Sequence, residues 1–281
     1  MKLTSIKDLA SGAADQLLVD RRVNLSALYD DLLESYDEGE DDHRRPGIHA
    51  SELCSCKRHV VYTLYATEKK KVTKKDMQKR FNVGNAIHDM LQSDFAKLAR
   101  RSGGFITFNK EVKVHETELA KKYDIDSSCD GIFEFWEKTG SGVAEVFLRI
   151  GLEIKSKSPD EYAKMKEPEK KHIEQATLYQ ACLDLPLVWY VYWNKGNQNY
   201  TPMTFPWLRK FDGAIWARME QRAKESLHAA DTEKLPDREE GFHCTWCPYA
   251  WTCQPPSVKQ QQNRGGPLVT PRALINKGKR W

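Results

Sequence analysis

The spacing of hydrophobic residues predicts helices at the two ends of the chain and strands between them. Apolar residues three and four apart predict helices over 1–36, 50–66, 81–101, 168–184 and 206–228. Alternation with a period of two predicts strands over 105–116, 128–136, 146–155, 188–193 and 200–205. We expect the first three strands to form a meander. Helices flanking a mixed central sheet give the chain an α/β fold class.

The predicted strand 146–155 carries the sharpest chemical signal. Its apolar residues alternate without a break, so Glu153 and Lys155 share the other face, roughly 7 Å apart at a rise of ~3.3 Å per residue. A carboxylate and a lysine at the end of a strand suit metal-assisted phosphodiester cleavage. The carboxylate would hold a divalent ion, and the lysine would orient or deprotonate water and offset phosphate charge.

Other polar residues can join this pair. Asp130 lies on the preceding strand and can approach Glu153 across the sheet, which would supply the two carboxylates that Mg²⁺ or Mn²⁺ usually needs. His88 follows Gly84 by one turn on an otherwise apolar helix face, where a packed core histidine is the usual explanation. Gln175 and Tyr179 are four residues apart and share one helical face.

Composition and charge narrow the class of protein. The chain has 281 residues, 40% hydrophobic and 30% charged, which fits one large or two small folded domains. There is no apolar run of about 20 residues and no secretory signal, so we expect a cytoplasmic protein with no membrane partner. The net charge is +4, but six Lys and Arg without an acid lie after residue 253, and seven more lie within 69–80. Such segments suit nucleic acid.

Three of the seven cysteines form a C-x2-C-x5-C motif at Cys244, Cys247 and Cys253. A fourth ligand would have to come from elsewhere, and Cys54 or Cys56 can supply it. Four thiolates fit structural zinc or a [4Fe–4S] cluster, and the spacing alone does not separate the two. Cys129 and Cys182 are expected to be small core residues.

The order Gly84-x-x-x-His88, Asp130, Glu153-Ile154-Lys155, Gln175-x-x-x-Tyr179 resembles the PD-(D/E)xK nuclease superfamily in its RecB-like branch, over about 50–253. The resemblance implies a restriction-endonuclease-like core. It also implies that His88, Asp130, Glu153 and the Ile154 carbonyl bind Mg²⁺ or Mn²⁺ and that Lys155 is the catalytic lysine. Gln175 and Tyr179 would contact DNA or brace the site.

One cysteine before this core and three after it are similar to the CRISPR-associated iron–sulfur nucleases and to the nuclease domain of AddB-type helicase–nucleases. In these, a [4Fe–4S] cluster joins the two ends of the fold. The run Cys56-Lys57-Arg58, with Tyr62 further on, matches their N-terminal signature better than Cys54 does. The resemblance therefore implies Cys56, Cys244, Cys247 and Cys253 as cluster ligands.

We therefore expect three segments: an N-terminal helical segment with an acidic connector over 1–45, a nuclease domain over 46–255, and a basic, disordered tail over 256–281. The expected function is a divalent-metal-dependent DNA exonuclease acting on single strands or DNA ends. A helicase, recombination or integration protein would be a separate partner, because the chain has no phosphate-binding helicase motif. The alternative is a non-catalytic nucleic-acid-binding or adaptor protein with a structural zinc site.

Overall fold

The computed structural model describes residues 47–65, 67, 75–138 and 143–253. The chain divides into two units, one of residues 1–45 and 71–83 and the other of residues 46–70 and 84–281. The sheet and the candidate site lie in the second unit. The predicted helix 1–36, the acidic connector, residues 69–74 of the basic run and the tail 256–281 lie outside the described residues.

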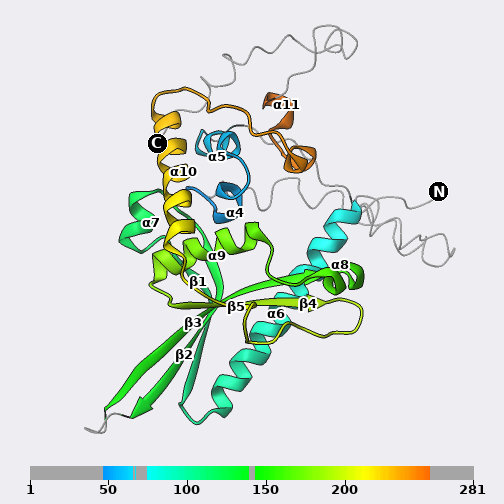
Figure 1. Ribbon diagram of the computed structural model, residues 1–281, viewed down its shortest axis with the longest axis vertical. Helices are drawn as coiled ribbons and strands as arrows, with labels where there is room; N and C mark the ends of the chain where they lie inside the picture. Colours follow the sequence, from blue (N-terminus) through cyan, green and yellow to red (C-terminus); the bar gives the residue numbers. More distant parts are fainter. Residues whose placement is uncertain (1–46, 66, 68–74, 139–142, 254–281) are drawn as a thin grey trace, which may run out of the picture. The chain divides into compact units, whose positions relative to one another are not determined.

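Five strands form one mixed sheet in the order β1-β2-β3-β4-β5 (Figure 1). They are β1 (Ile106–Lys113), β2 (Ser128–Lys138), β3 (Ala144–Lys157), β4 (Leu187–Asn194) and β5 (Leu208–Lys210). The first three strands form the predicted antiparallel meander, β4 runs parallel to β3, and β5 is antiparallel to β4. The predicted α/β class with a mixed sheet flanked by helices is confirmed.

The described residues also form short and long helices, some of which cover the sheet while others lie beyond it. They are α4 (Ala50–Leu53), α5 (Lys57–Leu64), α6 (Lys75–Arg101), α7 (Glu118–Lys122), α8 (Pro159–Lys164), α9 (Lys170–Leu183), α10 (Gly213–Asp231), the 3₁₀ helix η1 (Phe242–Trp246) and α11 (Ala250–Cys253). In the described ranges, none of the helices combines the length and the apolar character needed to cross a bilayer.

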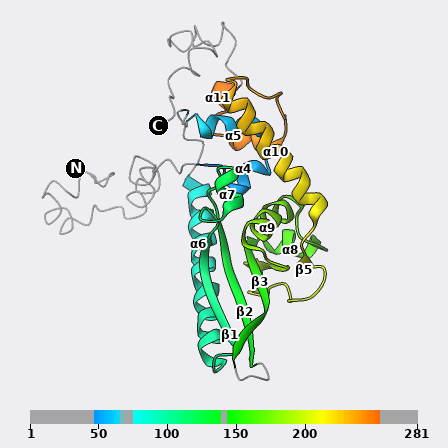
Figure 2. The ribbon, with the colours of Figure 1, turned by 90° about the vertical axis from the view of Figure 1, so that its left-hand side faces the viewer.

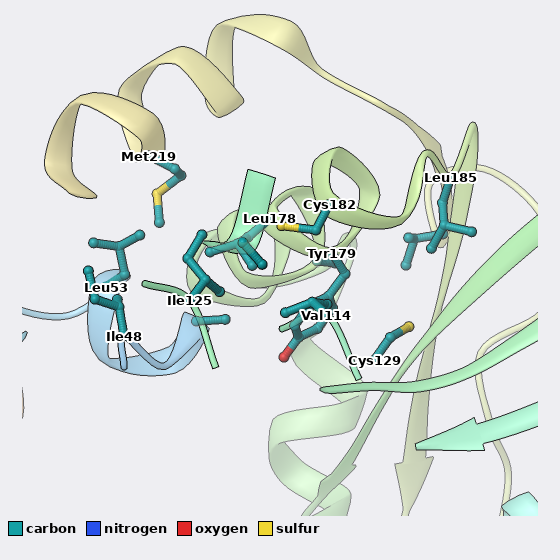
Figure 3. Close-up of a cluster of buried hydrophobic side chains, with 14 of the residues drawn as sticks. Ile48, Leu53, Val114, Ile125, Cys129, Leu178, Tyr179, Cys182, Leu185 and Met219 are labelled. Carbon is teal, nitrogen blue, oxygen red and sulfur yellow. The ribbon is translucent and has the colours of Figure 1, made fainter. Parts of the chain in front are cut away.

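The two faces of the sheet build two separate hydrophobic clusters. On one face, the part of α6 after Gly84 runs along the sheet (Figure 2). Its Ile87 and Leu91 join Ile150 and Ile154 of β3 in one buried cluster. On the other face, α4, α9 and α10 pack over Cys129 and Ile132 of β2 and over Val188, Tyr190 and Tyr192 of β4. Figure 3 shows this second cluster, in which Cys129 and Cys182 are both buried, as expected for core cysteines.

Gly131 of β2 lies directly against an aromatic ring of β1. A Cβ atom at this position would lie 2.5 Å from Cε2 of Phe108, well inside van der Waals contact. Phe108 stacks in turn against Phe133 with ring centroids 4.8 Å apart, so the ring cannot move aside freely. The absence of a side chain at residue 131 lets the two strands close over the ring immediately beside Asp130.

Three predicted elements are wrong in detail. The helix predicted over 50–66 is two helices. The Ser55 hydroxyl donates to the Glu52 carbonyl at 2.8 Å and ends the first helix. Cys56 then has an extended backbone (φ −152°, ψ 129°), and the second helix begins after it. Residues 200–205 are not a strand. The Thr201 hydroxyl donates to the Tyr190 carbonyl at 2.6 Å and takes the place of a backbone ladder bond.

The helix predicted from Pro206 begins only at Gly213. Residues 208–210 instead pair with β4 as β5, and the Asp212 carboxylate then caps α10 by accepting from the backbone N–H groups of Ala214 and Ile215 at 2.9 and 3.1 Å. The sequence analysis also missed α7 and α8, which are only five and six residues long. Gly103 and Gly104, both with positive φ, follow the end of α6 as predicted.

Candidate active site

Glu153 and Lys155 form a buried ion pair on β3. Glu153 is 1% exposed and Lys155 Nζ contacts its Oε1 atom. Lys155 Nζ also donates to the Ile154 carbonyl at 3.1 Å. The pair shares the face of β3 that α9 covers, whereas Ile150, Leu152 and Ile154 of the same strand pack under α6 on the other face.

Asp130 joins this pair from the neighbouring strand. Its Oδ2 atom accepts a hydrogen bond from the Ile154 backbone N–H at 2.5 Å, at the end of β2 where the pairing with β3 stops. His88 of α6 approaches the other carboxylate oxygen, with 3.8 Å between its Nδ1 atom and Asp130 Oδ1. The structure thus brings His88, Asp130, Ile154 and the Glu153–Lys155 pair together from α6, β2 and β3.

Burial dominates the electrostatics of this site. Burial raises the pKa of Glu153, the Lys155 ammonium opposes the rise, and the Asp130 carboxylate adds to it. Burial also raises the pKa of Asp130, against the opposing charges of Lys155 and His88. For Lys155, burial alone would lower the pKa, but the two carboxylates outweigh it and the pKa is raised. A single ammonium therefore faces two carboxyl groups whose pKa values are both raised.

The donor atoms at the site fit a hard divalent cation. Carboxylate and carbonyl oxygens are the usual protein ligands of Mg²⁺ and Mn²⁺. Both carboxylate oxygens of Glu153 are buried without a hydrogen-bond partner among the described residues, apart from their contact with Lys155. No three His, Cys, Asp or Glu side chains in the described ranges are arranged as a ready-made metal site. An ion would therefore require the Glu153 side chain to exchange its contact with Lys155 for the metal.

Gln175 and Tyr179 of α9 lie together above this part of the sheet. Gln175 Nε2 donates to the Tyr179 hydroxyl at 2.7 Å. Tyr179 is 3% exposed, and the charges of Glu153 and Asp130 add to burial in raising its pKa. This position suits bracing of the site, whereas direct contact with DNA would require exposure that the Tyr179 ring lacks.

Two residues that the sequence analysis missed support Asp130. Gln92 Nε2 donates to the Asp130 backbone carbonyl at 2.8 Å and to Glu111 Oε1 at 2.6 Å. Gln92 is 2% exposed and follows His88 by one helical turn, a spacing that could have been used to find it. Glu111 has a positive φ of 51°, a local irregularity of β1 that no sequence pattern revealed.

The structure also gathers cysteines from the two ends of the second unit. One cavity is lined by Cys56, Cys244, Cys247 and Cys253. Basic side chains border the sulfur atoms: His59 Nδ1 lies 3.7 Å from Cys247 Sγ, and Arg58 Nη1 lies 3.7 Å from Cys253 Sγ. Cys54 instead packs against the hydrophobic cluster beneath α9, and burial raises the pKa of its thiol.

Comparisons with known proteins do not assign a family to this chain. No family model matches it, and no curated protein matches it at a significant level. Among solved structures, SSO0001 is similar with a TM-score of 0.46 at 15% identity, covering 79% of this chain and 92% of that one. An alkaline exonuclease from Laribacter hongkongensis, LHK-Exo, is similar with a TM-score of 0.44 at 15% identity, covering 66% of this chain and 89% of that one. Its complex with dAMP gives a TM-score of 0.43 with the same identity and coverage. Similarity at this level assigns neither a family nor a function.

Proposed function

We propose that this protein is a divalent-metal-dependent DNA nuclease of the PD-(D/E)xK type, acting as an exonuclease on single strands or DNA ends. One observation carries the proposal: the Asp130 carboxylate contacts the Ile154 amide immediately beside the buried Glu153–Lys155 pair. A fully buried carboxylate beside a second, half-buried carboxylate and a half-buried lysine destabilises a fold unless the group serves a function. The order of these residues along the chain supports the same proposal.

In this proposal Asp130, Glu153, His88 and the Ile154 carbonyl hold Mg²⁺ or Mn²⁺. The ion would lower the pKa of a bound water and neutralise charge on the scissile phosphate. Lys155, which its two carboxylate neighbours keep as an ammonium, orients that water for in-line attack on phosphorus and offsets phosphate charge while the bond from phosphorus to the leaving sugar oxygen breaks. The surrounding apolar layers exclude bulk water and strengthen the charge interactions. Gln92 holds the Asp130 backbone in place, and Gln175 with Tyr179 braces the layer above Glu153.

A digestion assay tests the proposal. End-labelled single-stranded DNA is incubated with the protein and Mg²⁺ or Mn²⁺, and the products are mapped. We expect Glu153→Gln and Lys155→Ala to reduce digestion by at least 100-fold, since removal of one group that stabilises transition-state charge costs about 10²–10³ in rate. Both variants should still bind DNA.

Glu145→Gln is the matched control, because Glu145 is an exposed carboxylate on the same strand. It should digest DNA at the wild-type rate. Undiminished digestion by Lys155→Ala would refute the assignment. Tight DNA binding by a wild-type protein that cleaves no strand with either metal would also refute it, and would favour a non-catalytic binding protein.

We also propose that Cys56, Cys244, Cys247 and Cys253 hold a [4Fe–4S] cluster that joins α5 to the C-terminal cysteine segment. The shared cavity and the bordering Arg58 and His59 support four thiolates at this place. The cluster would be structural, since the cavity is built by elements away from the Glu153–Lys155 pair. Anaerobically purified protein should be brown, with about four iron and four sulfide per chain. Colourless protein with one zinc per chain would overturn the cluster assignment.

A further inference from the structure

A groove lies beside the candidate active site, and the proposed mechanism does not use it. Its volume is about 760 Å³, within the ~300–1,000 Å³ range of ligand sites. It runs between α9, β5 and the start of α10, and its lining includes Ile173, Leu208 and Ile215. Aliphatic walls of this kind, on three different elements, leave a concave apolar surface open to solvent.

The floor of the groove contains a polar group without a partner. Tyr190 of β4 lines the groove and is 1% exposed. Its hydroxyl forms no hydrogen bond with a described residue. The hydroxyl oxygen is also not fully enclosed by protein atoms. The hydroxyl is therefore available to a ligand. Tyr190 is also paired in register with Glu153 of the adjacent strand, so the groove and the candidate site are neighbours.

The rim of the groove has the composition of a nucleotide site. Phe205 is 83% exposed and Phe211 is 42% exposed, and exposed phenyl rings are the usual platforms on which bases stack. Arg209 and Lys210 stand on the same rim. The acid that lines the groove, Asp212, is committed to capping α10, and Glu167 approaches Arg209 at 3.5 Å from outside the lining. The cations at the rim favour an anionic ligand.

We propose that this groove binds one nucleotide unit of single-stranded nucleic acid. The base stacks on Phe205, the Tyr190 hydroxyl forms a hydrogen bond with the edge of the base, and Arg209 and Lys210 contact the flanking phosphates. The inference rests on the proposed nuclease function insofar as the bound strand is the substrate. It makes the substrate a single strand, because a base inside a duplex cannot reach a stacking platform in a groove.

Binding is measured with a fluorescein-labelled oligothymidylate in EDTA, so that cleavage does not interfere. We expect Phe205→Ala to weaken binding roughly 5- to 150-fold, the equivalent of one base stack at ~1–3 kcal/mol. Phe205→Tyr should restore it. Phe147→Ala is the matched control, because Phe147 is 56% exposed on β3 outside the groove lining, and it should bind as the wild type does.

Two further measurements locate the contacts. The slope of log affinity against log salt concentration is negative. Arg209→Ala combined with Lys210→Ala should make it less steep by about 1.4, as expected for the loss of two phosphate contacts on a single strand. An oligonucleotide containing 5-iodouracil should crosslink to Tyr190 or Phe205, identified by mass spectrometry. Wild-type affinity in Phe205→Ala, or crosslinks confined to residues outside the groove, would overturn the proposal.

These outcomes are distinguishable from failure of the proposed function. If Glu153→Gln abolishes digestion while Phe205→Ala binds and digests as the wild type does, the groove proposal is wrong and the nuclease stands. If the wild type binds the oligonucleotide through Phe205 but cleaves nothing, the groove proposal stands and the nuclease is wrong.

Discussion

The buried charges on β3 and β2 show how much of this protein's chemistry depends on single residues. Both carboxylate oxygens of Glu153 are buried away from water, and among the described residues their one polar contact is with Lys155. A buried carboxylate of this kind is unfavourable for stability, and its pKa is raised accordingly. Such residues persist where a ligand completes their coordination, which is the physical basis for assigning function to this pair.

His172 gives a prediction about stability at acidic pH. Burial, together with the charges of Lys155 and Lys171, lowers the pKa of His172 to about 2. The unfolded chain binds a proton at this histidine below about pH 6.5, whereas the folded chain does not, so stability falls as the pH drops below 6.5. We expect a loss of roughly 1–2 kcal/mol between pH 6.5 and pH 5, measured by urea denaturation.

His172→Gln should remove this part of the pH dependence, because a glutamine can still bond to the Tyr192 hydroxyl that now lies 2.7 Å from His172 Nδ1. His228→Gln is the control, since His228 is exposed near the end of α10. An acid-side slope that is unchanged in His172→Gln would show that other groups account for it.

At the residue scale, spacing in the sequence singled out residues that the structure brings together. The alternation along β3 gave Glu153 and Lys155 a common face, and the chain order indicated Asp130 and His88 as their partners. It missed Gln92 and Glu111, because an ordinary polar residue on a helix and a strand residue with positive φ have no distinctive pattern. It also left Tyr179 as either a DNA contact or a brace, and only burial favours the brace.

At the scale of elements, one arginine links three segments that are far apart in the chain. Arg222 of α10 donates to the Leu53 carbonyl of α4 at 3.0 Å and forms a two-pronged pair with Glu239, at 2.7 and 2.9 Å. Glu239 in turn accepts from the Lys57 backbone N–H at 2.8 Å, at the start of α5. The segment that leads to the cysteines is thereby held against the N-terminal helices.

Arg222→Lys should destabilise the protein by about 1–3 kcal/mol, because lysine cannot form the two parallel hydrogen bonds. The measurement is the free energy of unfolding in urea. Arg218→Lys is the control on the same helix, where the arginine is largely exposed and approaches Glu174 only at 3.9 Å. Equal stability of the two variants would contradict a structural role for the Arg222–Glu239 pair.

Element prediction failed where a side chain or a neighbouring strand replaced the local pattern. Thr201 uses its hydroxyl in place of a ladder bond, so alternation over 200–205 did not produce a strand. The residues Leu208-Arg209-Lys210 fit a helical pattern, yet they pair with the edge of β4 and form the antiparallel strand β5. Both outcomes depend on contacts between segments, which no window of sequence contains.

At the scale of the whole molecule, Cys56 and the cysteines 244–253 line one cavity although almost the entire second unit separates them along the chain. A metal-thiolate link from Cys56 to Cys244 would close a loop of nearly 190 residues. In cross-link models such a closure stabilises the fold by about 5 kcal/mol through loss of unfolded-state entropy. Such a link would stabilise both ends of the unit at once.

Cys247→Ala should accordingly make the C-terminal cysteine segment and α5 the first regions cut by a protease, before the sheet is lost. Limited proteolysis with mass spectrometry measures this. Cys182→Ala is the control, because Cys182 is a buried core cysteine away from the cavity, and its loss should leave the order of cleavage unchanged. A Cys247→Ala protein that resists protease as the wild type does would show that the thiols do not hold the ends together.

The tight approach of Gly131 to the Phe108 ring has a consequence for how this sequence can diverge. Any side chain at residue 131 would have to enter space that the ring already fills. A descendant can lose the glycine only if residue 108 has become smaller beforehand, so the two positions should co-vary. Sequences that keep an aromatic ring at residue 108 should therefore also keep the glycine at residue 131.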